Sequence, residues 1–219
     1  MNREIFKPKV SLISITPDAE KVITYIARVS NPDNQNNPNI AKLLKYCLDE
    51  GHVSIFEQAS ITIEVETHLA IATQILRHRS FCFQQFSQRY ADVGLLNESI
   101  PLFELRTQDT KNRQNSLDTL DEKIKDQFLF KIENHFVDAM RLYNEMIVSG
   151  IAKECARFVL PQATTTRMYI TGNIRSWIFY LRERLKDGVQ KEHRDVAKLC
   201  QNIFIEQLPV VSTSLGWNK

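Results

Sequence analysis

This chain has few glycines, only six in 219 residues, and none of them cluster. A Rossmann fingerprint and a P-loop both need closely spaced glycines, so neither phosphate-binding motif is present. The four cysteines form no CxxC pair and no Cys/His spacing typical of zinc, so we expect no metal ion. Without a signal peptide, such cysteines favour a reduced protein of the cytoplasm.

The sequence is also poor in net charge and in long apolar runs. Its formal charge is only +2, which is too balanced for a protein that coats nucleic acid or an anionic membrane. Its apolar runs are much too short to cross a bilayer. We therefore expect no nucleic-acid or membrane partner. Any bound phosphate must be held largely by side chains, and the fork of donors on arginine suits that task.

Segments with strand and helix patterns follow one another along the chain, without repeats or low-complexity tracts. Alternation and β-branched residues predict strands at 9–16, 59–67 and 163–172. Helical periodicity predicts helices at 17–30, 40–50, 68 to about 77, 116–148, 151–160, 173–185 and 190–207. Pro17 is expected in the first turn of its helix, and Asn173 at an N-cap.

These elements predict an α+β fold in a single domain, residues 1–219. We expect a central, mostly antiparallel sheet flanked by helices, including one long helix at about 116–148. Apolar residues recur along that helix at spacings of three or four: Phe128, Ile132, Phe136, Met140, Tyr143 and Ile147. Residues 91–112 are expected to be irregular, with short strands.

The stretch RHRSFCFQQFSQRY, residues 77–90, concentrates cations beside Phe and Gln. If it is extended, Gln85, Ser87 and Arg89 share one face, which suits a phosphate or the edge of a nucleobase. Gln74 lies one helical turn before the first arginine. Three interpretations stay open: a basic face that complements a helix dipole, a nucleic-acid patch, or a pocket for a phosphorylated ligand.

Other polar residues have a structural as well as a functional interpretation. Ser54 and Glu57 fit a capping box, so a helix start is expected there. Arg157 is embedded among apolar residues and needs a partner, either Glu154 or a ligand anion. Cys82 lies between two phenylalanines and is expected to be a packed, inert thiol.

His52 follows a helix-ending glycine and is expected to be an ordinary exposed histidine. On the helix at 173–185, Asn173 and Arg184 share nearly one face, whereas Arg175 and Arg184 point to opposite faces. This helix can present arginines to two ligands or two subunits, or it can be a charged amphipathic helix.

Taken together, these motifs resemble those of one family, the flavin-dependent thymidylate synthases. The hallmark is Arg-His-Arg, seven residues, then Ser, which appears here as RHR at 77–79 followed by Ser87. The other shared motifs occur in the family's order: ARVS at 27–30, GHVSIFEQ at 51–58, ARFVLP at 156–161 and NIR…L..R at 173–184. The resemblance covers about residues 10–205.

The resemblance implies a chemistry and an assembly. Enzymes of this family methylate dUMP at C5 to make dTMP, with 5,10-methylenetetrahydrofolate as carbon donor, FAD as hydride carrier and NADPH as reductant. Their subunits form homotetramers with active sites at the interfaces, which would explain the helix with two faces. We expect the same substrates, cofactor and assembly here.

The family's site residues are carried over by position. The implied catalytic residue is Arg184, similar to the arginine that activates the pyrimidine by stabilising charge across N3 and O4. The implied dUMP-binding residues are Gln74, Arg77, Gln85, Ser87, Gln88, Arg89, Arg157 and Arg184. The implied FAD-binding residues are Ser30, Ser54, Glu57, Arg77, His78, Arg79, Gln85, Asn173 and Arg175. His52 is expected near the folate or the flavin.

Three positions depart from the family pattern. Gln85 stands where Glu is usual, Phe179 where Asn is common, and Gly188 where a His occurs. The first change removes an acceptor-only group and is expected to alter flavin or nucleotide affinity. Two competing hypotheses are a family member that binds FAD without turnover, and a nucleotide- or RNA-binding module. The module predicts salt-dependent binding of oligonucleotides without flavin.

Overall fold

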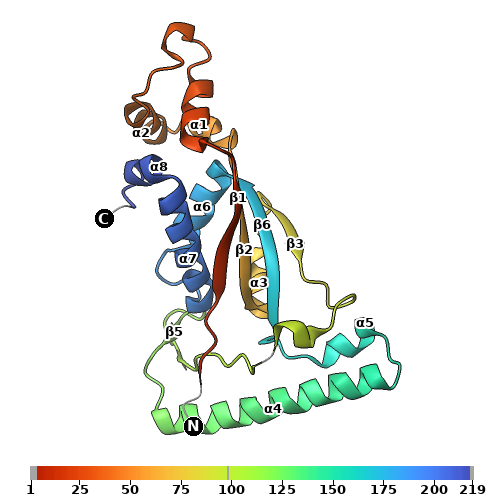
Figure 1. Ribbon diagram of the computed structural model, residues 1–219. Helices are drawn as coiled ribbons and strands as arrows, with labels where there is room; N and C mark the ends of the chain where they lie inside the picture. Colours follow the sequence, from red (N-terminus) through yellow and green to blue (C-terminus); the bar gives the residue numbers. More distant parts are fainter. Residues whose placement is uncertain (1–3, 98, 218–219) are drawn as a thin grey trace.

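The structure, a computed structural model, describes residues 4–97 and 99–217 and contains a four-stranded antiparallel sheet (Figure 1). The strands lie in the order β1 (Lys9–Ile15), β2 (Ser60–His68), β6 (Thr165–Asn173) and β3 (Cys82–Gln85). The predicted α+β class and antiparallel sheet are confirmed. The edge strand β3 is not among the predicted strands, because an extended conformation of residues 84–89 is only one of several interpretations of the sequence.

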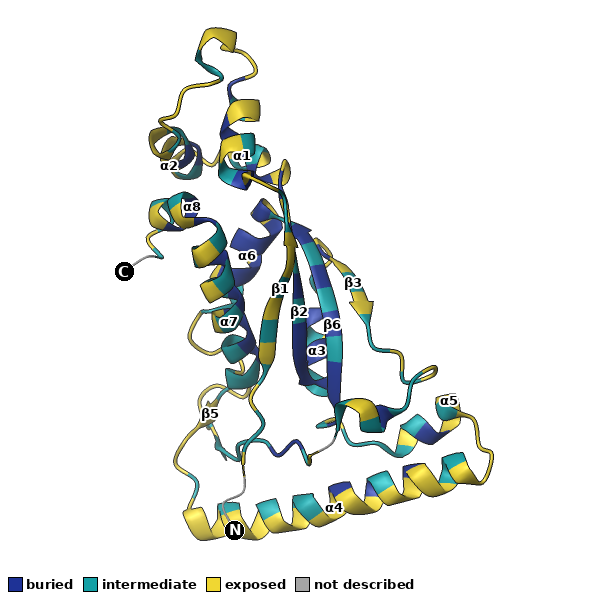
Figure 2. Ribbon diagram, in the orientation of Figure 1, coloured by how far each residue is buried: buried dark blue, intermediate teal, exposed yellow. Residues whose placement is uncertain are grey.

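Helices cover one face of this sheet, and the other face is less buried (Figure 2). The covering helices are α3 (Leu69–Ile75), α6 (Ile174–Arg184) and α7 (Lys191–Gln207). The other helices are α1 (Ala19–Ala27), α2 (Ala41–Asp49), α4 (Glu122–Val148), α5 (Lys153–Ala156) and α8 (Pro209–Ser214). In the described part of the chain, every helix is too short or too polar to cross a membrane.

Short elements complete the chain. The described residues include four 3₁₀ turns: η1 (Pro32–Asn34), η2 (Val53–Glu57), η3 (Val93–Leu96) and η4 (Arg157–Val159). A small hairpin pairs β4 (Thr107–Gln108) with β5 (Ser116–Leu117). The expectation of irregular structure with short strands at 91–112 is therefore confirmed.

The buried face of the sheet follows the alternation in the sequence. On β2, Ile61, Ile63 and Val65 are fully buried, whereas Thr62 and Glu64 are half-buried on the opposite face. This is the pattern of a strand that buries one side. The prediction for this strand is confirmed.

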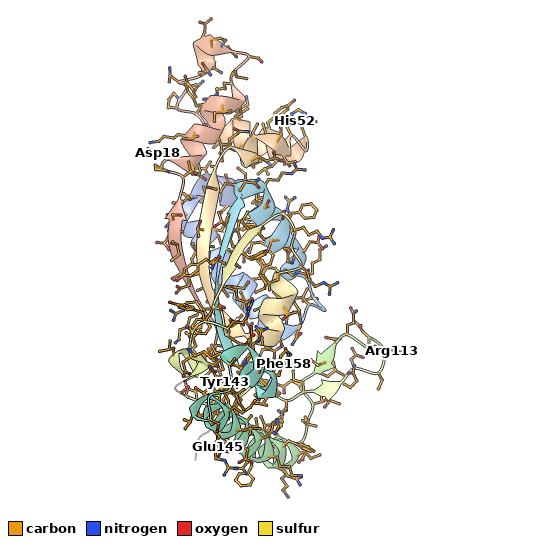
Figure 3. The ribbon with its side chains drawn as sticks, turned by 90° about the vertical axis from the view of Figure 1, so that its right-hand side faces the viewer. Asp18, His52, Arg113, Tyr143, Glu145 and Phe158 are labelled. Atoms are coloured by element: carbon orange, nitrogen blue, oxygen red, sulfur yellow. The ribbon has the colours of Figure 1, made fainter. Side chains whose placement is uncertain are left out.

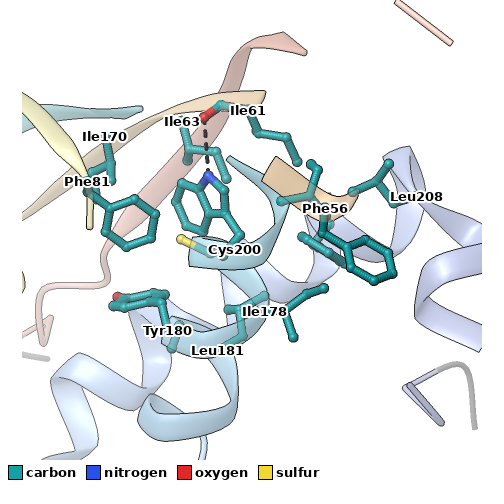
Figure 4. Packing of buried hydrophobic residues seen from close by; sticks show 14 of the residues in the cluster. Phe56, Ile61, Ile63, Phe81, Ile170, Ile178, Tyr180, Leu181, Cys200 and Leu208 are labelled. Atoms are coloured by element: carbon teal, nitrogen blue, oxygen red, sulfur yellow. Dashed lines mark hydrogen bonds between the residues drawn. The ribbon is translucent and has the colours of Figure 1, made fainter. Parts of the chain in front are cut away.

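Trp177 fixes α6 to the sheet. Figure 4 labels its neighbours Ile61, Phe81 and Tyr180, and the dashed line marks its hydrogen bond to Ile61. Its side chain is fully buried, and its Nε1 donates a hydrogen bond to the backbone oxygen of Ile61 at 3.2 Å. The rings of Phe81 and Tyr180 pack against it, at 4.8 and 5.8 Å between centroids. Asn173 caps the same helix by accepting from the Ser176 N–H at 2.8 Å, which fixes where α6 begins. The contacts of Trp177 fix the rotation of α6 about its axis.

The long helix α4 begins at Glu122, so its predicted start at Ser116 is wrong. The Asp121 side chain accepts from the N–H groups of Lys123 and Ile124 and caps the helix there. Residues Ser116–Leu117 belong to β5 instead. The predicted apolar stripe is only partly buried, because Phe128 is 48% exposed.

Three other predicted boundaries also differ. Pro17 lies before the first turn of α1, because Asp18 adopts a left-handed conformation and the helix starts at Ala19. Helix α3 ends at Ile75, which leaves Arg77 in the turn that follows. The helix at 151–160 is shorter and continues as η4, and α8 after Pro209 was not predicted.

Candidate functional site

Arg184 is the last residue of α6 and is half-buried. Its Nε donates a hydrogen bond to Nε2 of His78, in the turn after α3, at 2.8 Å. Burial and the charge of Arg184 lower the pKa of His78 to about 4, so near pH 7 the imidazole is neutral and accepts this bond. A neutral partner leaves the guanidinium its full charge, and the bond uses only one of its five N–H donors.

Gln74, on α3, is held by two partners. Its Nε2 donates to Oε1 of Gln190 at 2.6 Å, and its Oε1 lies 3.3 Å from Nδ1 of His193. Nε2 of the fully buried His193 lies 3.2 Å from the Tyr180 hydroxyl. The rings of Tyr180 and His78 meet edge-on at 4.9 Å. Two buried side chains thus connect Gln74 to the pair formed by His78 and Arg184.

Ser87 and Arg89 line a hollow of about 340 Å³ beside α5. Arg89 Nη2 lies 2.9 Å from Oε2 of Glu154, and both side chains are more than half exposed. An exposed ion pair of this kind is weak, so a phosphate can replace the carboxylate. Lys153, which no motif in the sequence marks, adds a cation to this hollow and donates to the backbone oxygen of Tyr90 at 3.0 Å.

Arg157, at the start of η4, is half-buried. The expected alternative of a partner in Glu154 is wrong, because that carboxylate is paired with Arg89. The guanidinium lies 5.7 Å from the ring centroid of Phe158, which is 81% exposed. This contact stabilises a cation without neutralising it. A ligand anion stays the predicted partner of Arg157.

The extended conformation considered for 84–89 ends early. Strand β3 stops at Gln85, and Ser87 begins a turn in which its backbone oxygen accepts from the Tyr90 N–H at 3.1 Å. Ser87 and Arg89 meet at the hollow because of this turn rather than because they share a strand face. Gln85 itself donates from Nε2 to Oγ1 of Thr166 at 3.2 Å, which a Glu carboxylate could not do.

The side-chain Nε2 of Gln88 is a donor suited to bind a ligand. Its Nε2 is buried and has no hydrogen-bond partner among the residues that the structure describes. Buried donors of this kind are rare in native proteins, because each leaves a desolvation cost uncompensated. The atom is therefore available to a bound molecule.

A second polar group lies at the start of α6. Arg175 forms an ion pair with Glu57 of η2, and both are exposed. The capping box predicted for Ser54 and Glu57 is wrong, because the 3₁₀ turn starts at Val53 after His52 and makes no side-chain capping bond. Arg175 and Arg184 do contact different neighbours, as predicted from their angular separation.

The segment that carries Ser30 surrounds a hollow of about 480 Å³. Its wall combines donors such as Lys42 with the apolar side chains of Leu43 and Tyr46. The ring of His52 meets Tyr46 edge-on at 5.9 Å, so His52 lies beside this hollow and is exposed as predicted. Figure 3 shows His52 near α1 and Phe158 near α4, toward opposite ends of the molecule.

The turn after α3 exposes both Arg77 and Arg79. Cys82, which follows them, is also exposed, so the prediction of a packed thiol is wrong. The reason is that side chains alternate along β3, so Phe83 faces the core while Cys82 lies on the opposite, exposed face. In the described ranges, His, Cys, Asp and Glu side chains form no cluster of three that could hold a metal ion.

The predicted residues thus form separate groups within one chain. Gln74, His78 and Arg184 lie together, and Ser87 and Arg89 lie at the hollow beside α5. Of the residues implied for FAD, Ser54, Glu57 and Arg175 lie at η2 and the start of α6, whereas Gln85 lies on β3. A hollow of about 750 Å³, larger than the two above, is elsewhere, between α4 and the residues Asn97, Ser99 and Ile100. Cavity size alone therefore does not locate the site.

The sequence is similar to a known family and to two of its members. Residues 11–210 match the family model described as thymidylate synthase complementing protein. The chain is 50% identical over 200 residues to a probable flavin-dependent thymidylate synthase of Paramecium bursaria Chlorella virus 1, with 91% of each chain covered. It is 46% identical over 211 residues to the flavin-dependent thymidylate synthase of Synechocystis sp., with 96% of each covered.

A comparison of folds agrees with these relatives. The crystal structure of the UMP/dUMP methylase PolB from Streptomyces cacaoi, bound with 5-Br dUMP, matches with a TM-score of 0.84. The match covers 96% of this chain and 95% of that one at 24% identity, and at that identity it shows the fold alone. Because the family model spans nearly the whole chain and both relatives are closely similar, this protein belongs to the flavin-dependent thymidylate synthases.

Proposed function

We propose that this flavin-dependent thymidylate synthase methylates dUMP at C5, with 5,10-methylenetetrahydrofolate as carbon donor, FAD as hydride carrier and NADPH as reductant. The observation that carries the proposal is the contact of Arg184 with a neutral His78. It presents a fully charged, pre-oriented guanidinium at the end of a helix that Trp177 fixes to the sheet.

Arg184 is the proposed catalytic residue. Its planar donors suit N3 and O4 of uracil, where negative charge develops as C5 becomes nucleophilic. A guanidinium does not give up its proton near pH 7, so it acts by electrostatic stabilisation rather than as an acid. Activation of C5 in this way needs no enzyme thiol, and the exposed Cys82 is left without a role in the chemistry.

The remaining dUMP contacts are proposed to hold the nucleotide. Ser87, Arg89 and Arg157 bind the phosphate, and Arg89 exchanges Glu154 for it. Gln74 and Arg77 lie on the uracil side with Arg184. The unpaired Nε2 of Gln88 gives this set a buried donor that is ready for a ligand.

The residues present also fit a flavin. The hollow at Ser30 offers hydroxyl and cationic groups beside an apolar wall, which is the usual make-up of a cofactor site. The residues proposed to hold FAD are Ser30, Ser54, Glu57, Arg77, His78, Arg79, Gln85, Asn173 and Arg175. When bound, the flavin supplies hydride chemistry. His52 is proposed to lie near the flavin or folate, since it borders the same hollow through Tyr46.

We further propose a homotetramer that works in the cytoplasm. Helix α4 exposes Phe128 and Leu142 on one face and Val137 and Val148 on nearly the opposite face, two apolar surfaces that further copies of this chain would bury. A partner subunit would also bring the separate groups of site residues together. All four cysteines are free, which suits a reducing compartment.

Purified protein tests the function. We expect it to be yellow with bound FAD, and to oxidise NADPH only when dUMP and methylenetetrahydrofolate are present, with dTMP as the product. Titration with dUMP should perturb the flavin absorption spectrum. Colourless protein that neither takes up FAD nor binds dUMP would contradict the proposal. Protein that binds FAD without forming dTMP would point to a family member that has lost turnover.

A further inference from the structure

His193 is a fully buried polar side chain that the proposed mechanism does not use. It lies on α7, with Tyr180 of α6 on one side and Gln74 of α3 on the other. Tyr180 is only 1% exposed. A buried imidazole is costly unless both ring nitrogens are hydrogen-bonded, and here both have a partner.

The donor and the acceptor of each hydrogen bond in this network can be derived by starting from Glu192. Glu192 is an acceptor only, held by Arg106 at 2.6 Å. Burial by itself raises the pKa of Glu192, but hydrogen bonds from its own backbone and from Arg106 lower it by more. The net pKa lies below the usual value, so the group is a carboxylate. Gln190 must therefore donate to it from Nε2, at 3.0 Å, which leaves Oε1 of Gln190 to accept from Gln74.

The same logic fixes the tautomer of His193. Because Gln74 donates from Nε2 to Gln190, its Oε1 is the acceptor that faces His193, and Nδ1 of the ring must carry the hydrogen. Burial and the charge of Arg184 lower the pKa of His193 to about 3, so the ring is neutral. Nε2 is then an acceptor and takes the Tyr180 hydroxyl hydrogen.

A continuous chain of hydrogen bonds therefore runs from the Tyr180 hydroxyl through His193, Gln74 and Gln190 to the carboxylate of Glu192. We propose that His193 and Tyr180 are positioning residues that set which way the Gln74 carboxamide faces, so that its remaining N–H and lone pair are aimed at the pyrimidine nucleotide. The inference rests on the proposed function, since it takes Gln74 to contact dUMP. A flipped carboxamide would exchange donor and acceptor at the ligand and lose one hydrogen bond.

Substitutions of His193 can separate positioning from packing. His193→Leu fills the space but removes the donor to Gln74. His193→Asn places an amide N–H where Nδ1 lies and keeps that donor. Tyr180→Phe keeps the buried ring and removes only the hydroxyl, so it tests the network even if His193→Leu folds poorly. Asn202→Ala, on an exposed side of α7, is the control.

The experiment measures dUMP binding, FAD binding and melting temperature for each variant of the flavin-loaded protein. We expect His193→Leu to weaken dUMP binding about 10-fold, the size of one lost hydrogen bond, with FAD affinity unchanged. His193→Asn should recover most of this loss, and Tyr180→Phe should show a smaller loss in the same direction. Asn202→Ala should match the wild type.

A double-mutant cycle gives the decisive comparison. If His193 acts through Gln74, His193→Leu should have no further effect on dUMP affinity in a Gln74→Ala background. Equal losses in both backgrounds, or unchanged dUMP affinity in His193→Leu, would overturn the inference while the proposed function stands. Wild-type protein that fails to bind dUMP would overturn both.

Discussion

Replacing Arg184 with alanine is expected to reduce dTMP formation by about 100- to 1,000-fold or more, the usual cost of removing an electrostatic group at the reacting centre. The guanidinium is the group proposed to face the charge that develops on uracil. Its contact with the neutral His78 orients it without weakening its field. The measurement is single-turnover formation of dTMP from bound dUMP, with flavin content read from the absorption spectrum.

Two further variants make this result specific. Arg184→Lys keeps the charge but loses the planar fork, so we expect it to recover little activity. Arg182→Ala removes an exposed cation two residues away on the same helix, and it should behave like the wild type. Substantial dTMP formation by Arg184→Ala with flavin bound would show that another group activates the pyrimidine.

Gly172→Ala is expected to destabilise the protein and to disorganise the turn that carries Arg77, His78 and Arg79. Gly172 lies on β6, and a Cβ there would overlap the ring of Phe81 at Cδ1 and Cε1. This ring cannot move freely, because it is packed against Trp177. Overpacking a filled core costs about 1–3 kcal/mol, which lowers the melting temperature of a chain this size by several degrees.

The same substitution should lower activity as well as stability, because Phe81 directly follows the RHR turn and its ring lies 6.4 Å from that of His78. Phe81→Leu removes ring atoms that the new Cβ would meet. We therefore expect the double variant to melt higher than the sum of the two single effects predicts. Unchanged melting temperature and activity in Gly172→Ala would contradict the packing described around Phe81.

Local signals in the sequence located most elements correctly. The alternation on β2 reflects one buried face, and Asn173 caps α6 because its short side chain reaches the Ser176 N–H. The start of α4 was placed too early, because residues 116–121 continue a helix-like apolar spacing. Only the pairing of β5 with β4 and the Asp121 cap decide where this helix begins.

The site was predictable only in part, because its organisation depends on contacts that are distant in sequence. The motif resemblance identified Arg184 and His78, but their hydrogen bond joins the end of α6 to the turn after α3. His193 carries no local signal, since a lone histidine on a helix is usually unremarkable. Its role became visible only once α7 packed beside Gln74. The Arg89–Glu154 pair is likewise created by folding.

We propose that each active site draws on more than one subunit, because the groups around Arg184 and Arg89 lie apart within one chain. Arg184→Ala and Arg89→Ala protomers with different tags can be co-expressed, and the mixed oligomers isolated through both tags. If the two arginines come from different protomers, one site of each pair regains both, and dTMP formation should return although each variant alone is inactive. Mixed oligomers that stay as inactive as the single variants would contradict the account.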